Sequence, residues 1–162
     1  MNPGLPLVSF VIPAYNAAKT LPRTLQSLLG QTEVNWEAVV IDDGSKDRTS
    51  AVVRTHSVAD RRIRLLKQKN SGAAAARNLG IKDARAPYVV FLDADDWIEP
   101  AYLETMLPLM TDEDIIAYCA YRRVLPSGRE GPADWCPELQ TDAFQLLARR
   151  CEPAIHCVVA PR

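Results

Sequence analysis

The stretch YVVFLDADD, residues 88–96, decides how the rest of this chain is interpreted. Its first five residues are apolar and rich in β-branched and aromatic side chains, which is typical of a strand buried on both faces of a sheet. Three carboxylates, Asp93, Asp95 and Asp96, then follow within four positions. Because like charges repel, this cluster indicates a place where a bound cation relieves the repulsion.

Two of these acids are suited to share one ligand. If the chain stays extended, Asp93 and Asp95 lie on the same side of the backbone, because strand side chains alternate with a period of two. Carboxylate oxygens are hard ligands that suit Mg²⁺ or Mn²⁺, and phosphate oxygens and water commonly complete the Mg²⁺ shell. The alternative is a solvated acidic turn in front of a helix whose first turn favours acids.

The composition is that of an ordinary globular domain. With 162 residues, 48% of them hydrophobic and 24% charged, we expect a single domain over residues 1–162. A net charge of −1 gives no overall attraction to nucleic acid or to an anionic membrane. Basic residues do cluster at 61–64 and 67–69, where they form either a solvated face or a contact for phosphate.

Neither a membrane segment nor a disulfide framework is expected. No apolar run approaches the ~20 residues that span a bilayer, and the N-terminus lacks the pattern of a signal peptide. We therefore expect a soluble, cytoplasmic chain without a transmembrane segment, which would reach the inner membrane face only through parts outside this sequence. The cysteines, at positions 119, 136, 151 and 157, contain no C-x-x-C pair, which favours reduced thiols over a zinc site.

Hydrophobic periodicity and turn residues predict alternating strands and helices. The expected strands are residues 8–12, 36–41, 63–66, 88–92, 115–121 and 154–160, and the expected helices are residues 20–30, 47–59, 73–81, 101–107 and a last helix beginning at Asp142. Asn16 is a candidate cap of the first helix, and Pro13 should stop the first strand. Residues 131–139 are expected to form a surface loop.

This alternation predicts an α/β fold with a mainly parallel central sheet and helices on both faces. Ligands of such sheets bind beyond the carboxyl ends of the strands, where residues 13–16, Asp42 with Asp43, and the 93–95 acids all fall. No G-x-G-x-x-G and no Walker A loop follows the first strand, which argues against a dinucleotide oxidoreductase or a P-loop NTPase.

Four blocks of sequence, in this order, resemble family 2 glycosyltransferases of the GT-A fold. They are VIPAYN at 11–16, IDDGSKD at 41–47, NSG at 70–72 with ARNLG at 76–80, and FLDADD at 91–96. The resemblance is strong over about residues 7–110 and weak beyond. It implies a nucleotide-diphospho-sugar transferase-like fold, a nucleotide-sugar donor that is usually a UDP-sugar, and inverting transfer to an acceptor hydroxyl, as in cell-wall or polysaccharide biosynthesis.

The resemblance also implies roles for individual residues. Pro13, Ala14 and Tyr15 would line the nucleoside pocket, Asp42 or Asp43 would accept a hydrogen bond from the base, Asp93 would lie near the ribose and the metal, Asp95 would be the main protein ligand of Mn²⁺ or Mg²⁺, and Arg77 would support the donor site. A divalent ion bridging the donor phosphates would stabilise the charge that develops on the leaving group.

The catalytic base has no clear counterpart here. Inverting transfer needs a base to take the acceptor proton, and in the family this acid lies in a later E-D block after a glycine-rich segment, which this sequence lacks. Glu138, Asp142 and Glu152 are candidate substitutes, although each is better explained as a loop, cap or surface acid. We therefore expect a donor-binding portion, truncated before the acceptor-binding and base-bearing part, which transfers sugar poorly; the glycan or lipid-linked acceptor stays unassigned.

Two other interpretations remain open. The strand that ends in Asp93 and Asp95 also resembles the signature of haloacid dehalogenase-like phosphatases, but in that fold it should be the first strand of the domain. Here it is the fourth, and Trp97 follows the acids. The other interpretation is a non-catalytic nucleotide-sugar-binding module.

Overall fold

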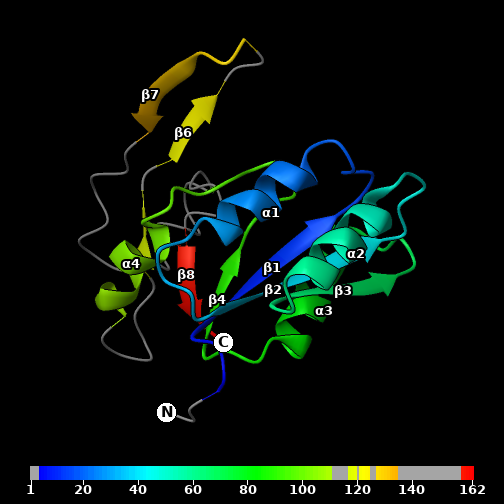
Figure 1. The fold of residues 1–162 in the computed structure, drawn as a ribbon, viewed down its shortest axis with the longest axis horizontal. Coiled ribbons are helices and arrows are strands. Elements are labelled where there is room, and N and C mark those ends of the chain that lie inside the picture. The colour runs from blue at the N-terminus through cyan, green and yellow to red at the C-terminus, as the bar shows by residue number, and fades with distance from the viewer. Residues whose placement is uncertain (1–3, 111–116, 120, 125–126, 135–157) are drawn as a thin grey trace.

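The computed structural model describes residues 4–110, 117–119, 121–124, 127–134 and 158–162 (Figure 1). Its strands are β1 Val8–Ala14, β2 Trp36–Asp43, β3 Ile63–Gln68, β4 Tyr88–Phe91, β5 Ala117–Tyr118, β6 Tyr121–Val124, β7 Glu130–Asp134 and β8 Val158–Pro161. Its helices are α1 Leu21–Leu29, α2 Thr49–Ala59, α3 Ala73–Asp83 and α4 Tyr102–Met106, with a short 3₁₀ turn, η1, at Leu107–Leu109.

The central sheet has six strands in the order β3-β2-β1-β4-β8-β5. The first four in this order are mutually parallel, whereas β8 runs antiparallel to both β4 and β5. The mixed but mainly parallel sheet confirms the predicted fold class. As a result, β1, β2 and β4 end at the same edge of the sheet, and the blocks that follow them are brought together there.

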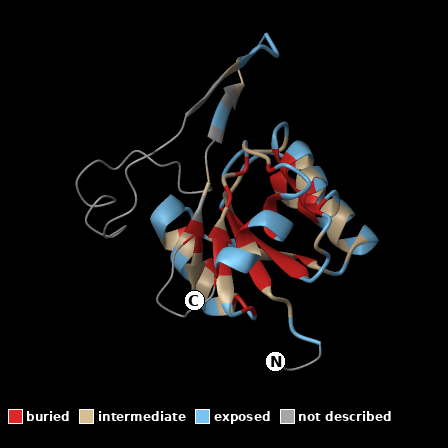
Figure 2. Ribbon diagram, turned by 90° about the vertical axis from the view of Figure 1, so that its left-hand side faces the viewer, coloured by how far each residue is buried: buried red, intermediate tan, exposed pale blue. Residues whose placement is uncertain are grey.

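Helices cover both faces of the sheet, and the alternation of side chains along the strands explains how. Phe10, Ile12 and Val40 point to the face that α1, α2 and α4 cover, whereas Val11 and Val39 pack with Ala76 of α3 on the other face. Figure 2 shows the buried strands between helices with exposed outer sides. A strand buried on both faces reads as a continuous apolar run, as residues 10–12 and 38–41 do.

The first strand extends past the residue expected to stop it. Pro13 pairs with Ile41 inside β1, and Ala14 pairs with Asp42. The N–H of Leu92 bonds to the carbonyl of Val11, so the backbone polar groups of Val11 face β4. Because these groups alternate between the two neighbouring strands, the backbone nitrogen of Pro13, two residues later, faces β4 as well. Pairing with β4 ends at Val11, so the missing N–H of Pro13 leaves no sheet hydrogen bond unmade.

The C-terminal part differs from the sequence prediction in two places. The strand expected at 115–121 is divided: β5 joins the central sheet, and β6 belongs to a separate two-stranded sheet with β7. Residues 130–134, expected in part as a loop, form β7, because their backbone groups pair with β6 across the turn at 127–129. This hairpin projects from the body of the molecule above α4 (Figure 1).

Several predictions fall on residues outside the described part. They concern the helix from Asp142, residues 154–157 of the last strand, the candidate bases Glu138, Asp142 and Glu152, and the cysteines at 136, 151 and 157. Within the described part, none of the helices combines the length and the apolar character needed to cross a bilayer.

Candidate functional site

A cavity of about 460 Å³ lies at the edge of the sheet where β1, β2 and β4 end. The predicted site residues Pro13, Ala14, Tyr15, Asp43, Arg77, Asp93 and Asp95 line it, together with Asn16, Ala17, Thr20, Ala73 and Ala94. Asp42 is the one predicted site residue that does not. The cavity therefore gathers residues from all four sequence blocks around one space, and Arg77 is the contribution of the third block.

One wall is the loop between β1 and α1. Tyr15 is 49% exposed there, so its ring is available to a ligand. Asn16 has a left-handed φ of 51°, a conformation that asparagine tolerates better than most residues. The prediction that Asn16 caps the first helix is wrong: α1 begins at Leu21 after Thr20, and the Asn16 side chain instead accepts a hydrogen bond from the N–H of Lys46 at 2.8 Å.

Asp42 turns inward, into the loop between β2 and α2. Its Oδ1 accepts the N–H of Ser45 at 2.9 Å, and its Oδ2 accepts the hydroxyl of Ser50. Burial raises the pKa of Asp42, but these hydrogen bonds outweigh burial and hold the pKa below its ordinary value. Both oxygens of Asp42 are thus used to shape the loop.

Asp43 lies beside the cavity and is anchored from the β3 side. Its Oδ1 accepts the side-chain amide of Gln68 at 2.7 Å and the N–H of Ser71 at 2.8 Å, and its Oδ2 accepts the N–H of Gly72 at 2.9 Å. Burial raises the pKa of Asp43, and the Gln68, Ser71 and Gly72 hydrogen bonds lower it further than burial raises it. Asp43 is therefore a fixed, ionised carboxylate, and within the described part of the chain one lone pair of its Oδ2 is left for a ligand.

Arg77 links α3 to the acid cluster. One of its terminal nitrogens, Nη2, lies 2.6 Å from Oδ1 of Asp93, and both side chains are partly exposed. The Nε of Arg77 is buried and has no hydrogen-bond partner within the described residues. A guanidinium that lines a cavity and whose charge is only partly matched by one carboxylate contact is suited to bind an anion.

The acids reach the cavity through a turn rather than along a strand. β4 ends at Phe91, and the N–H of Asp96 bonds to the carbonyl of Asp93 at 3.1 Å. The extended geometry considered from the sequence is therefore not present, yet Asp93 and Asp95 both line the same cavity.

A divalent cation fits this donor set only if a ligand shares it. No group of three or more acidic, histidine or cysteine side chains suited to hold a metal occurs within the described ranges. Three carboxylates line the cavity, but Asp43 is anchored by hydrogen bonds from the β3 side and Asp93 is already paired with Arg77. One or two carboxylates therefore remain for a cation. This matches the way Mg²⁺-type ions bind, through one or two carboxylates and the phosphates of a substrate, rather than in a cage made only by protein.

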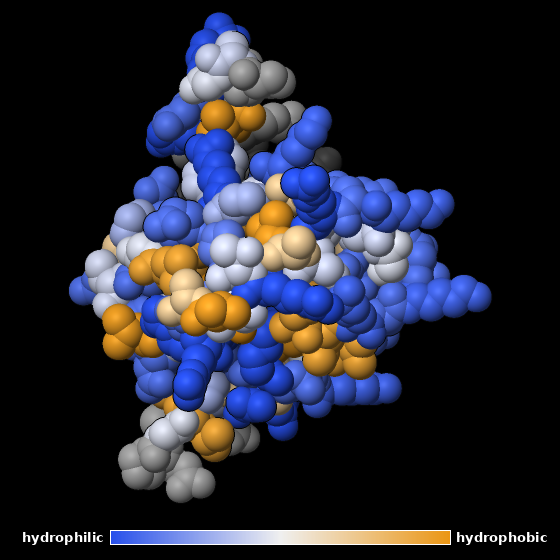
Figure 3. Space-filling view, turned by 45° about the vertical axis from the view of Figure 1, so that its right-hand side comes forward, coloured by the Kyte–Doolittle hydropathy of each residue, from blue (hydrophilic) through white to orange (hydrophobic). Residues whose placement is uncertain are grey.

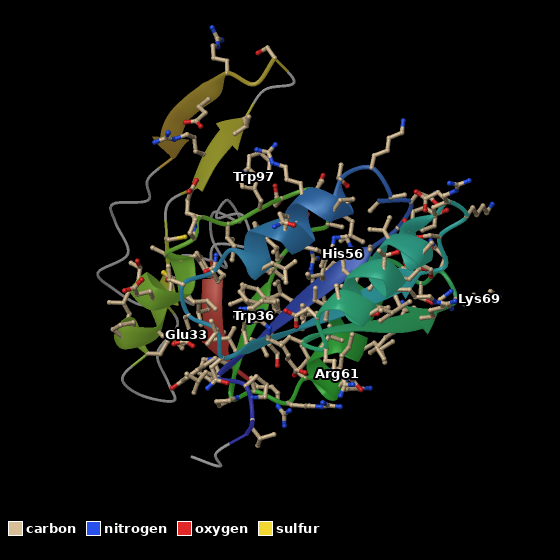
Figure 4. All side chains as sticks on the ribbon, in the orientation of Figure 1. Glu33, Trp36, His56, Arg61, Lys69 and Trp97 are labelled. Atoms are coloured by element: carbon tan, nitrogen blue, oxygen red, sulfur yellow. The ribbon has the colours of Figure 1, made fainter. Side chains whose placement is uncertain are left out.

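The segment after the acids is held by α1. The guanidinium of Arg23 stacks on the ring of Trp97, 3.2 Å from its centroid, and Trp97 is labelled beside α1 in Figure 4. The buried Gln31 donates to the carbonyl of Glu99 at 2.7 Å and accepts the N–H of Leu103 at 3.1 Å. α1, through Arg23, and Gln31, which follows the helix, therefore hold the segment directly after the acids; the residues they contact do not themselves line the cavity.

The basic clusters at 61–64 and 67–69 do not line the cavity. Arg62 pairs with Asp60 and stacks on Trp36, and Arg64 pairs with Glu37 and Asp83. Arg61 and Lys69, labelled in Figure 4, lie at opposite ends of β3. Arg62 and Arg64 are thus held in ion pairs within the fold, rather than forming the solvated face or the phosphate contact considered from the sequence.

Thr20, Ala17 and Ala73 are cavity residues that the sequence did not assign. All three lie in the loops or first helical turns that follow the carboxyl ends of β1 and β3. Their small side chains gave no chemical signal, and only their position after a strand could have indicated them.

The chain matches the model of the family described as "Glycosyl transferase family 2" over residues 9–161. The chain belongs to this family. The resemblance drawn from the four blocks is confirmed, and the phosphatase interpretation is left without support.

Curated relatives of this family 2 chain are longer than it is. It is 38% identical over 116 residues to the "Putative glycosyltransferase EpsH" of Bacillus subtilis, which covers 72% of the chain and 34% of the relative. It is 37% identical over 127 residues to the chondroitin synthase of Escherichia coli, covering 78% of the chain and 18% of the relative. The chain thus spans about a third of the first of these relatives and less of the second.

Solved structures share the fold. The mannosyltransferase PcManGT from Pyrobaculum calidifontis, in complex with GDP-Man and Mn²⁺, superposes with a TM-score of 0.63 at 26% identity, covering 74% of this chain and 36% of that one. S. aureus TarS 1–349 in complex with UDP-GlcNAc superposes with a TM-score of 0.58 at 28% identity, covering 65% and 31%. The family 2 chain therefore has the GT-A fold of these transferases.

Proposed function

We propose that this chain binds the donor, a nucleotide-diphosphate sugar, for a sugar-transfer reaction, and that it does so with a divalent cation. The observation that carries the proposal is the single cavity that brings together Tyr15, Asp43, Arg77, Asp93 and Asp95. An aromatic ring, two anchored acids, a guanidinium and a further exposed acid are the groups needed for a base, a ribose, a diphosphate and a cation. The described body acts as one donor-binding domain.

Different residues of the cavity would contact the base and the diphosphate of the donor. The exposed ring of Tyr15 offers an apolar surface for the base, and Asp43 offers its unused lone pair to a base N–H. Pro13 and Ala14 form the floor at the end of β1. Arg77 holds Asp93 in place and directs positive charge towards the diphosphate.

Asp95, with Asp93, would hold Mn²⁺ or Mg²⁺ against the donor phosphates. When bound, such an ion supplies Lewis-acid stabilisation of the nucleoside diphosphate that leaves. The sugar would be transferred with inversion to an acceptor hydroxyl. A UDP-sugar is the donor we favour, because the related TarS structure contains UDP-GlcNAc, although the related PcManGT structure contains GDP-Man.

The test is calorimetric titration of the chain with UDP, GDP and ADP, each with and without Mn²⁺. We expect one nucleoside diphosphate to bind in the micromolar range and to lose at least about tenfold in affinity without Mn²⁺. Asp95→Asn should remove the Mn²⁺ dependence, because an amide oxygen is a weaker ligand for a hard cation.

Glu99→Gln is the matched control, because it removes the same charge from an exposed acid that does not line the cavity. Binding of no nucleoside diphosphate by the wild-type chain, or Mn²⁺ dependence that survives Asp95→Asn, would refute the donor site. Donor binding with no transfer to any acceptor by the longest available form would favour the non-catalytic module.

A further inference from the structure

The segment Asp42–Thr49 contains polar side chains that the proposed function does not use. Of this segment only Asp43 lines the cavity. Ser45, Asp47 and Thr49 nevertheless point their oxygens towards the neighbouring β1–α1 loop, which does line it. Their hydrogen bonds indicate what they do.

Three consecutive backbone N–H groups of the β1–α1 loop donate to three different side chains of this segment. Asn16 donates to Oγ of Ser45 at 3.0 Å, Ala17 to Oγ1 of Thr49 at 2.8 Å, and Ala18 to Oδ2 of Asp47 at 3.0 Å. A fourth bond runs the other way, from the N–H of Lys46 to Oδ1 of Asn16. We call Ser45, Asp47 and Thr49 the brace.

The brace is itself ordered from within. Oδ1 of Asp47 accepts both the N–H and the hydroxyl of Thr49, which leaves the oxygen of Thr49 free to accept from Ala17. Thr49 is fully buried. The bond from Ala17 to Thr49 is partly buried, and leaving the Thr49 oxygen or the Ala17 N–H without a partner there would be costly, so this bond holds the loop in position.

The loop needs such support because its backbone lacks partners in the sheet and includes an unfavourable conformation. The pairing of β1 with β2 ends at Ala14 and Asp42, so the amides of residues 16–18 have no strand to bond to. Asn16 also holds a left-handed φ of 51°. Conformations of this kind persist only where the surroundings hold them.

We propose that Ser45, Asp47 and Thr49 are positioning residues that hold the β1–α1 loop so that Tyr15 and Asn16 line the cavity before the nucleotide arrives. The expected effect on nucleotide affinity rests on the proposed function. A loop ordered in advance spares the nucleotide the entropy of ordering it, so the brace raises affinity without touching the ligand.

Thr49→Val is the central variant, because valine keeps the shape of threonine and loses its hydroxyl. Thr49→Ser keeps the hydroxyl and should rescue. Thr55→Val on the same helix is the control, since the Thr55 hydroxyl bonds to the carbonyl of Ala51 within α2 and lies on an exposed residue. Asp47→Ala, at an exposed position, serves if Thr49→Val does not fold.

Two readouts are taken on the full chain, well below the unfolding midpoint of every variant. The first is amide hydrogen exchange of residues 14–20 without nucleotide, which should become about tenfold faster in Thr49→Val because the loop opens locally. The second is the Kd for UDP with Mn²⁺, which should rise about tenfold. Thr49→Ser and Thr55→Val should match the wild type in both.

Unchanged exchange in Thr49→Val and Asp47→Ala would overturn the proposal, and so would faster exchange with unchanged affinity. If the wild-type chain binds no nucleoside diphosphate, the proposed function fails by that result alone. The exchange readout then still decides whether the brace holds the loop, so the two failures are distinguishable.

Discussion

At the scale of single residues, the neighbours Asp42 and Asp43 have different hydrogen-bond partners and different positions relative to the cavity. Consecutive residues of a strand point to opposite faces, so Asp42 turns towards Ser45 and Ser50 and Asp43 towards Gln68 and the 71–72 amides. Both carboxylates are buried and ionised. Of the two, Asp43 lines the cavity and Asp42 does not. The resemblance offered either acid as the hydrogen-bond acceptor for the base, and position now favours Asp43. The role itself stays a prediction.

The lowered pKa of Asp43 predicts acid sensitivity. Its folded pKa lies below the value of 3.8 for an unperturbed aspartate, so between the two pKa values the unfolded chain binds more protons than the folded one. The stabilisation by Asp43 is present above 3.8 and is lost as the pH falls through the folded pKa. Asp43→Asn should lower the free energy of unfolding by about 1–3 kcal/mol at pH 7 and by less near pH 3.

Urea unfolding of the wild type and of Asp43→Asn between about pH 7 and pH 3, at constant ionic strength, measures this difference. A difference between the two that stays constant over the whole range would contradict the assigned pKa direction.

At the scale of elements, α3 illustrates why a weakly amphipathic helix can pack closely. Ala76 and Gly80, the two buried residues of the helix, let it lie directly on Val11 and Ile41 of the sheet. Gly80 is fully within the helix, where glycine is otherwise unfavourable, so close packing explains its presence. The same close approach brings Arg77, one turn earlier, to Asp93.

Gly80→Ala tests this packing. A Cβ at position 80 would overlap Cγ1 of Val11 and lie 2.8 Å from Cδ1 of Ile41. Overpacking should cost about 1–3 kcal/mol of unfolding free energy and exceed the gain of up to about 1 kcal/mol in helix propensity. Denaturant unfolding measures the net change.

Gly30→Ala, at the end of α1, is the control. Its new Cβ would meet only the carbonyl of Gln26 at 3.6 Å and that of Ser27 at 3.8 Å, which are ordinary contacts. A Gly80→Ala chain as stable as Gly30→Ala would show that α3 can shift away from the sheet without cost.

At the scale of the whole molecule, the cavity is the place where segments far apart in the sequence meet. The net charge is −1, and the face in Figure 3 is mainly hydrophilic with several separate apolar areas. The site collects residues from β1, β2, α3 and the segment after β4. Binding there should therefore tie together elements that are far apart in the sequence.

Nucleotide and metal together should stabilise the folded chain by mass action. At ligand concentrations about 100 times the Kd, the gain is about 2.7 kcal/mol, which for a chain of this size corresponds to a rise in Tm of about 5–10 °C. UDP with Mn²⁺ should produce this shift, and Mn²⁺ alone should produce a much smaller one, because two carboxylates without phosphate make an incomplete shell.

Thermal unfolding followed by circular dichroism, with Mn²⁺, UDP, both or neither, measures the shift. An equal rise in Tm with Mn²⁺ alone would mean that the chain holds the metal without the nucleotide, contrary to the shared site.

Much of the fold could be predicted because its signals are local. The apolar runs of β1, β2 and β4, and the leucine stripe of α1 that ends at Gly30, indicated their elements to within one or two residues. The prediction that Pro13 stops the first strand was wrong, because the effect of a proline depends on which neighbouring strand its missing N–H faces. The loop prediction was wrong for residues 131–134, where a glycine and a proline suggested a loop but the backbone pairs with β6 as a strand.

The sequence alone determined the alternation of strands and helices, the family, and the set of acids at strand ends, because each depends on residue type and spacing along the chain. Tertiary structure alone decided that Asp43 lines the cavity and Asp42 does not, that Arg77 pairs with Asp93, and that Ser45, Asp47 and Thr49 hold the loop that contains Tyr15. The physical reason is that these relations are hydrogen bonds and ion pairs between segments 16 or more residues apart, whose directions follow from strand order and helix placement and leave no mark in the spacing of the sequence.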